Sequence, residues 1–281
     1  MTPRVAACVT CHGRDGQATN SGYFPRIAGK PAGYLYEQLR NFRDGRRLQP
    51  AMNHLLTNLS DAYLREMAEH FAALHYPYPA PAASDLSADA LTRGRTLVFE
   101  GDAARGLPAC ASCHGAKGQG MAAFPPLAGQ GSSYLRSQLE AFADGSRGNP
   151  IMAPIAKGLT PQQRADVAAY FASLPSGIAA TAGQAGAKDK GAWLVERGRM
   201  QDGIPACNSC HGPGGAGVGA HFPAIAKLGA GYMQAQIDAW KKGSRPPGPL
   251  GLMEGIAQKL SSDDVNAIAQ YYAGASGAAK P

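Results

Sequence analysis

The chain has 281 residues, a formal net charge of +7 and a hydrophobic fraction of 44%. The positive charge is not gathered into a Lys/Arg run or stripe, so the sequence does not indicate nucleic-acid binding. No stretch of 18 or more strongly apolar residues occurs, and we expect no segment that spans a membrane. Length alone suggests about two domains, but an internal repeat indicates three.

The repeat is a Cys-x-x-Cys-His motif that occurs three times and uses all six cysteines of the chain. This motif is the attachment sequence of a c-type haem. Two thiols add to the two vinyl groups of one porphyrin, and the imidazole that follows can bind the iron as its proximal ligand. We therefore expect three covalently attached haem c groups. The residues predicted for attachment and proximal ligation are Cys8, Cys11, His12, Cys110, Cys113, His114, Cys207, Cys210 and His211.

A Cys-x-x-Cys pair can also be a redox dithiol or half of a zinc site. A zinc ribbon would pair two such elements about 15–20 residues apart. Here 102 residues separate Cys8 from Cys110, and 97 separate Cys110 from Cys207. Spacings of this size are a domain period, which favours three haem domains over one metal site.

Each motif is followed by a Gly-rich loop, a Phe-Pro segment and then an amphipathic stretch with helical periodicity at residues 33–39, 133–139 and 231–237. An arginine follows each predicted helix. Two interpretations of these arginines remain open: a solvated basic residue, or a partner of the haem propionates, because Arg suits pairing with carboxylates. The three are Arg47, Arg147 and Arg245.

A methionine comes next in each repeat, 40, 38 and 42 residues after the proximal histidine. A single Met is usually core filler, but three at nearly constant offset predict distal iron ligands, each in a loop between two helices. They are Met52, Met152 and Met253. His54 lies two residues beyond Met52 and is an alternative ligand in the first repeat.

A second helix closes each repeat, and helical stretches at 91–100 and 191–200 precede the second and third motifs. Only seven residues precede Cys8, so the N-terminal helix of the first domain is expected to be missing or truncated. The predicted fold is all-α, with three tandem domains, each a small helical fold around one haem. Their limits are 1–79, 84–176 and 188–281.

Together these motifs resemble class I cytochrome c and, within it, the cytochrome c4 branch. The resemblance covers all three domains and is most complete in the second, with its Asn149-Pro150-Ile151-Met152 segment. The third domain departs from it at Lys227, where the others have Gly29 and Gly129. Members of this branch usually have two such domains, so the chain looks like a triheme relative. The resemblance implies His/Met ligation and a hydrogen bond from the proximal imidazole to the carbonyls of Pro25, Pro125 and Pro223.

Iron held by both His and Met offers substrate no place to bind, so we expect an electron carrier and not an enzyme. The resemblance implies an electron-carrying role in the bacterial periplasm. Because covalent haem attachment in bacteria takes place outside the cytoplasmic membrane, we expect that a signal or anchor was removed. The first hypothesis is a carrier that serves a terminal oxidase or reductase of a respiratory chain. The second is the electron-accepting haem subunit of a periplasmic dehydrogenase complex. The third is a multihaem enzyme with one open haem, for which the third domain is the candidate.

Overall fold

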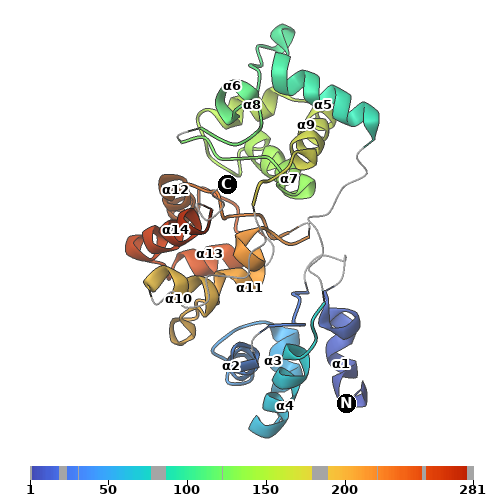
Figure 1. Ribbon diagram of the computed structural model, residues 1–281, viewed down its shortest axis with the longest axis vertical. Coiled ribbons are helices and arrows are strands. Elements are labelled where there is room, and N and C mark those ends of the chain that lie inside the picture. The colour runs from blue at the N-terminus through green and yellow to red at the C-terminus, as the bar shows by residue number, and fades with distance from the viewer. Residues whose placement is uncertain are drawn as a thin grey trace. The chain divides into compact units, whose positions relative to one another are not determined.

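The computed structural model consists of helices joined by loops (Figure 1). It describes residues 2–18, 24–30, 32–76, 87–121, 123–178, 189–219, 221–248 and 251–276. Within these ranges no strand forms, and the β pairing is limited to isolated bridges. In the same ranges no helix is long and apolar enough to cross a membrane. The predicted all-α class is confirmed.

The chain forms two compact units. The first comprises Met1–Tyr78 with Arg197–Pro205, and the second comprises Pro79–Glu196 with Ala206–Pro281. The domains predicted at 84–176 and 188–281 therefore lie in one unit, apart from Arg197–Pro205. The predicted limits at 1, 79, 84, 188 and 281 fall outside the described residues.

The first unit is built on two long helices that pack against each other, α2 and α4. Apolar side chains of α2 (Leu35 and Phe42) face those of α4 (Leu64 and Phe71), and all four are buried. The Ser60 side chain caps α4 by accepting the N–H of Tyr63. The described helices of this unit are α1 (Thr2–His12), η1 (Arg14–Gly16), α2 (Ala32–Arg43), α3 (Pro50–Leu56), α4 (Asp61–Ala72) and η3 (Met200–Asp202).

Helix α1 carries the first Cys-x-x-Cys-His motif at its C-terminal end. It is held to α4 by the Tyr63 hydroxyl, which donates to the Arg4 carbonyl at 2.9 Å, and by an ion pair between Arg4 and Glu66. The second and third motifs are instead preceded by separate helices. The first repeat thus has one helix where each of the others has two.

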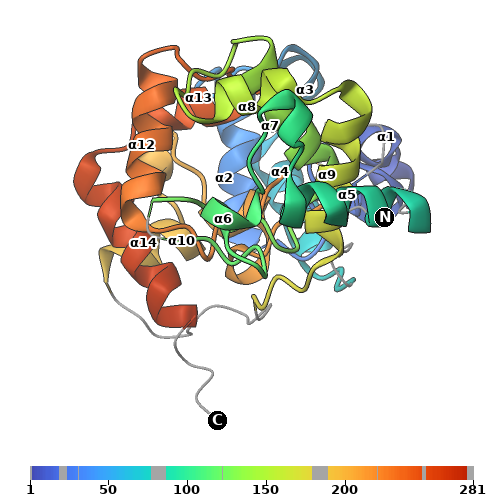
Figure 2. The same ribbon diagram turned by 90° about the horizontal axis from the view of Figure 1, so that it is seen from above.

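The described part of the second unit contains two copies of an arrangement of five α-helices. In each copy a helix before the motif crosses the last helix of the repeat, α5 with α9 (Figure 1) and α10 with α14 (Figure 2). The helices are α5 (Ala88–Glu100), η2 (Ala103–Arg105), α6 (Ala111–His114), α7 (Ser132–Ala143), α8 (Met152–Gly158), α9 (Pro161–Ser173), α10 (Lys190–Glu196), α11 (Cys207–His211), η4 (Pro213–Gly215), α12 (Ala230–Lys241), α13 (Leu252–Ala257) and α14 (Ser262–Ser276).

A glycine allows each of these two helix pairs to approach closely. A Cβ atom at Gly94 of α5 would lie 2.2 Å from the backbone oxygen of Asp166 in α9. A Cβ atom at Gly191 of α10 would lie 2.2 Å from the backbone oxygen of Ala267 in α14. Both distances are far below van der Waals contact, so any larger residue would force the helices apart.

Candidate haem sites

The proximal histidine of each motif is buried and held by a proline carbonyl. The exposed fraction is 8% for His12 and 7% for both His114 and His211. The Nδ1 atom lies 2.7 Å from the Pro25 oxygen in the first repeat, 2.9 Å from the Pro125 oxygen in the second and 2.7 Å from the Pro223 oxygen in the third. The contact that the resemblance implied is present in all three repeats.

The loop after each histidine is folded by the same backbone hydrogen bonds. In the second repeat the Gly118 carbonyl accepts the N–H groups of Leu127 and Ala128, and the Gly120 N–H donates to the His114 carbonyl at 2.8 Å. Gly118 has φ +63°, in the left-handed region that favours glycine. The equivalent bonds join Gly16 to Ile27 and Ala28, and Gly215 to Ile225 and Ala226. This shared loop brings each proline carbonyl to its histidine.

In each of the three imidazoles, Nε2 is the nitrogen available to bind a metal. Burial lowers the pKa of His12, His114 and His211, and the hydrogen bond to the proline carbonyl raises it only in part. The lowered pKa favours the neutral form of each ring. Because Nδ1 donates its hydrogen to the proline carbonyl, the lone pair is left on Nε2.

A cavity of about 740 Å³ lies where the second and third repeats meet, and residues of both line it, including Tyr232 and Gln236 of the third. Its lining includes His114, Cys110 and Met152, together with apolar side chains such as Leu135 and Phe142. This volume lies in the range of pockets that hold cofactors. The predicted thiol, proximal ligand and distal ligand thus border one apolar space, and the residues fit a covalently bound haem.

Burial disfavours the thiolate form of the first cysteine in each motif. Burial raises the pKa of Cys110 to about 11 and that of Cys207 to about 12, and it also raises the pKa of Cys8. A redox dithiol or a zinc ligand requires a lowered thiol pKa. Over the described part of the chain, no three His, Cys, Asp or Glu side chains gather as metal ligands. The raised thiol pKa values weigh against the redox-dithiol interpretation of the motif.

The expectation that the methionines lie in loops is wrong. Each lies in the first turn of a short helix: Met52 in α3, Met152 in α8 and Met253 in α13. In the first two repeats a polar side chain just before the helix satisfies its free N–H groups. The Gln49 side chain accepts from the Met52 N–H, and the Asn149 side chain accepts from the Met152 N–H at 2.8 Å.

His54 is an exposed residue of α3, two positions after the half-buried Met52. Two residues along an α-helix correspond to a rotation of about 200°. His54 and Met52 therefore leave the helix on opposite sides, which favours Met52 as the ligand of the first repeat.

Arg147 and Arg245 have partners that the sequence analysis did not foresee. Arg147 donates to Gln138 of its own domain at 2.7 Å and to Gln236 of the third domain at 2.6 Å. Arg245 donates to Gln236 of its own domain at 3.0 Å and to Gln138 of the second domain at 3.3 Å. Each guanidinium also reaches the tyrosine hydroxyl of the other domain, Tyr232 at 3.1 Å and Tyr134 at 3.0 Å.

These two guanidinium groups are buried, with exposed fractions of 6% for Arg147 and 7% for Arg245. Burial and the charge of Arg147 lower the pKa of Arg245, although Tyr134 partly offsets them. Among the residues that the structure describes, no carboxylate forms an ion pair with either guanidinium. Two buried positive charges with neutral partners favour an anion nearby, and Arg147 borders the 740 Å³ cavity. The haem propionates would supply that anion.

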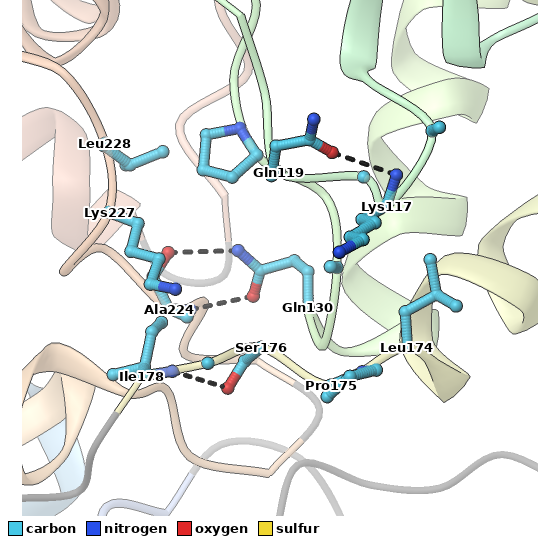
Figure 3. A pocket seen from close by; sticks show the side chains of 15 residues that line it. Lys117, Gln119, Gln130, Leu174, Pro175, Ser176, Ile178, Ala224, Lys227 and Leu228 are labelled. Carbon is cyan, nitrogen blue, oxygen red and sulfur yellow. Dashed lines mark hydrogen bonds between the residues drawn. The ribbon is translucent and has the colours of Figure 1, made fainter. Parts of the chain in front are cut away.

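A second contact between these domains passes through Gln130, which is also buried. Its side chain donates to the Ala224 carbonyl at 3.0 Å and accepts the Ala224 N–H at 2.8 Å (Figure 3). Ala224 follows Pro223, the residue that holds His211. Gln130 was not singled out from the sequence, because its partner lies 94 residues away.

Two further sets of residues recur at constant spacing in the sequence, although they were not predicted as functional. A tyrosine lies four residues before each of Gln38, Gln138 and Gln236, and an arginine follows nine residues after each glutamine. Gly94 and Gly191 both lie 16 residues before the first cysteine of their motif. Constant offsets between repeats would have found both sets.

Comparison with known proteins supports the same family for the second and third domains. A model of the cytochrome c family matches residues 91–175 and 190–274. The chain is 43% identical over 205 residues to the thiosulfate dehydrogenase electron acceptor of Stutzerimonas stutzeri, a match that covers 72% of this chain and 95% of that protein. It is 38% identical over 192 residues to cytochrome c4 of Pseudomonas aeruginosa, with 66% and 94% covered.

A solved structure is similar as well. Thiosulfate dehydrogenase TsdBA from Marichromatium purpuratum, in its as-isolated form, has a TM-score of 0.58 and 43% sequence identity. The match covers 65% of this chain and 40% of that chain. The present chain therefore spans less than half the length of that protein.

Proposed function

Since this chain belongs to the cytochrome c family, we propose that it is a periplasmic triheme cytochrome and the electron acceptor of a thiosulfate-oxidising dehydrogenase. It would pass single electrons on to a respiratory oxidase or reductase. The observation that carries this proposal is the repeated unit of buried histidine, proline carbonyl and methionine-bearing helix. Bound haem c supplies one-electron oxidation and reduction at iron.

The third haem is proposed for the first domain, which lies outside the two segments matched by the family. Its support is geometric. His12 contacts the Pro25 carbonyl as the other two histidines contact theirs, and Phe24 packs edge-on against His12 at 6.3 Å between ring centroids. The corresponding distances are 6.1 Å for Phe124 and His114 and 6.4 Å for Phe222 and His211.

The residues proposed to hold the three haems divide by role. The cysteines form the thioether bonds, the histidines and methionines bind the iron, and Arg147 and Arg245 face the propionates. When both axial positions are filled by protein, substrate cannot reach the iron. This ligand set supports a carrier over a multihaem enzyme, and the same reasoning extends to Met253 in the third domain.

The proposed electron donor rests on two relatives. The proteins of Stutzerimonas stutzeri and Thiomonas intermedia, 43% and 46% identical to this chain, are both thiosulfate dehydrogenase electron acceptors. This favours the second of the three hypotheses, an electron-accepting haem protein of a periplasmic dehydrogenase. Periplasmic location is supported by the haem attachment motifs, because covalent attachment in bacteria takes place outside the cytoplasmic membrane.

The test is a stopped-flow experiment on the oxidised holoprotein mixed with thiosulfate and a thiosulfate dehydrogenase. We expect reduction of the haem absorbance only when enzyme and thiosulfate are both present. Dithionite then gives the full extent of reduction for comparison. A holoprotein that dithionite reduces but the dehydrogenase does not would contradict the proposed donor and leave the carrier role intact.

A further inference from the structure

The third domain contains a chain of hydrogen bonds that runs from a carboxylate to its Cys-x-x-Cys-His motif. Glu196, the last residue of α10, accepts through Oε1 from the Asn208 side chain at 3.0 Å and from the Tyr271 hydroxyl at 2.6 Å. Asn208 lies between the two cysteines of the motif, and its Oδ1 accepts the Tyr272 hydroxyl at 2.8 Å. Tyr272 is fully buried and Glu196 is half-buried. These bonds tie the haem-attachment turn to α10 and α14.

Apolar residues occupy the corresponding positions of the second domain. Phe99 lies 11 residues before the first cysteine of its motif, as Glu196 does. Ala111 follows that cysteine directly, as Asn208 does in the third motif. The ring of Tyr170 packs edge-on against Phe99, at 6.2 Å between ring centroids. The second domain therefore has an aromatic contact at the place where the third has a carboxylate.

Tyr272 stands where the other two domains have a phenylalanine. Its ring packs on a glycine of the haem loop, so closely that a Cβ atom at Gly215 would lie 2.7 Å from it. In the second domain Phe171 holds the same place, 2.9 Å from a Cβ atom at Gly118, and in the first domain Phe71 does so. Of these three rings only that of the third domain carries a hydroxyl, and this hydroxyl extends the chain of bonds.

The charge of Glu196 acts at the sulfur that would attach the third haem. Burial raises the pKa of the Cys207 thiol to about 12, and the charges of Cys210 and Glu196 add to this rise. For Cys110, the charge that adds to burial is that of Cys113 in its own motif. Among the residues that the structure describes, no ion pair involves Glu196. In a protein interior such a charge interacts more strongly than in water.

We propose that Glu196 acts through Asn208 and Tyr272 to lower the reduction potential of the third haem below that of the second. Oxidised haem iron carries one more positive charge than reduced iron, so a nearby negative charge favours the oxidised state. The hydrogen bonds polarise one another and extend this effect to the attachment turn. Electrons would then pass from the third haem to the second. The inference rests on the proposed carrier function and gives it a direction.

The experiment is a spectroelectrochemical titration of the holoprotein. Glu196→Gln removes the charge but keeps an oxygen that can accept from Asn208 and Tyr271. We expect the midpoint of the third haem to rise, with a shift of at least about threefold in its reduction equilibrium, or about 28 mV for one electron. The other two midpoints should not move. Met253→Ala identifies the third haem, because it changes the proposed iron ligand of that haem alone.

Asp263→Asn is the matched control, because it removes the same charge from an exposed residue in the first turn of α14 in the same domain. It should leave the midpoint of the third haem unchanged. Asn208→Ala interrupts the chain of bonds, so the effect of Glu196→Gln should be smaller in this background. An undiminished effect there would overturn the proposed route.

A third-haem midpoint that stays or falls in Glu196→Gln would overturn the inference, and so would an equal rise in Asp263→Asn. A wild-type third haem with a midpoint above that of the second would overturn the direction of transfer. Failure of the proposed donor is a separate result, because a dehydrogenase that does not reduce the holoprotein leaves midpoints measured at an electrode unaffected.

Discussion

The guanidinium of Arg93 donates two hydrogen bonds to the carboxylate of Asp166, one from Nε at 2.7 Å and one from Nη2 at 2.9 Å. Asp166 lies in α9 and its side chain is 2% exposed, whereas Arg93 lies in α5 and is half exposed. Gln162 adds a third hydrogen bond at 2.9 Å. The third domain repeats the arrangement with Lys190 of α10 and Asp264 of α14 at 2.9 Å. An ion pair thus joins the first and last helices of each domain.

Replacing Asp166 with Ala should destabilise the second unit by about 1–3 kcal/mol, because three hydrogen bonds to a buried acceptor are lost. Thermal unfolding of the holoprotein, followed by circular dichroism, measures the effect. The control is Glu140→Ala, which breaks the pair between Arg136 and Glu140 on the exposed surface of α7. Such a pair contributes little, so an equal loss of Tm in both variants would contradict a special role for Asp166.

The same contact makes stability depend on pH in the acid range. Burial raises the pKa of Asp166, but the hydrogen bonds from Arg93 and Gln162 outweigh it and hold the pKa below its usual value. The stabilisation is therefore complete above the unfolded pKa of about 3.9 and is lost as pH falls through the lower, folded pKa. We expect the difference in unfolding free energy between wild type and Asp166→Asn to shrink below pH ~4. A difference that grows with acid would contradict this.

Gly94→Ala should destabilise the crossing of α5 and α9 by about 1–3 kcal/mol or more, because its Cβ would overlap the Asp166 backbone. Urea unfolding of the holoprotein gives the change. Gly255→Ala is the control, since a Cβ there meets nothing within 4 Å and the residue is exposed in α13. That change should be neutral or stabilising by about 0.5–1 kcal/mol. Equal losses in the two variants would mean that close helix approach is not the cause.

The sequence was most informative where chemistry fixes residue type and spacing. The cysteines and histidines follow from haem attachment, and the contact of His114 with Pro125 follows from the family resemblance. The contacts across the domain boundary could not be derived in this way. The bonds of Arg147 to Gln236 and of Gln130 to Ala224 join residues 89 and 94 positions apart, and nothing local in the chain marks such pairs. The short helix that begins at Met152 was not predicted, and the side chain of Asn149 accepts its first N–H group.

Met152→Ala should open the haem site of the second domain, because it removes the sulfur proposed as the distal ligand. The visible spectrum of the dithionite-reduced holoprotein is recorded before and after carbon monoxide is added. We expect no change for the wild type and a shift that corresponds to one haem in the variant. Met121→Ala is the control, since Met121 is an exposed methionine of the same domain. A shift in the wild type would instead reveal an open haem, and the enzyme hypothesis would then lead.

The first domain should bind haem through Cys8 and Cys11, because its histidine, proline and glycine contacts match those of the other two domains. Haem per chain, measured by the pyridine haemochrome assay and by mass of the intact protein, should equal three. Replacing both cysteines with Ala should lower it to two, while Met52→Ala should leave three haems attached, since thioether bonds do not depend on the distal ligand. A wild-type chain with two haems would show that the loop geometry around His12 is not sufficient for attachment. The carrier would then be limited to the second and third domains.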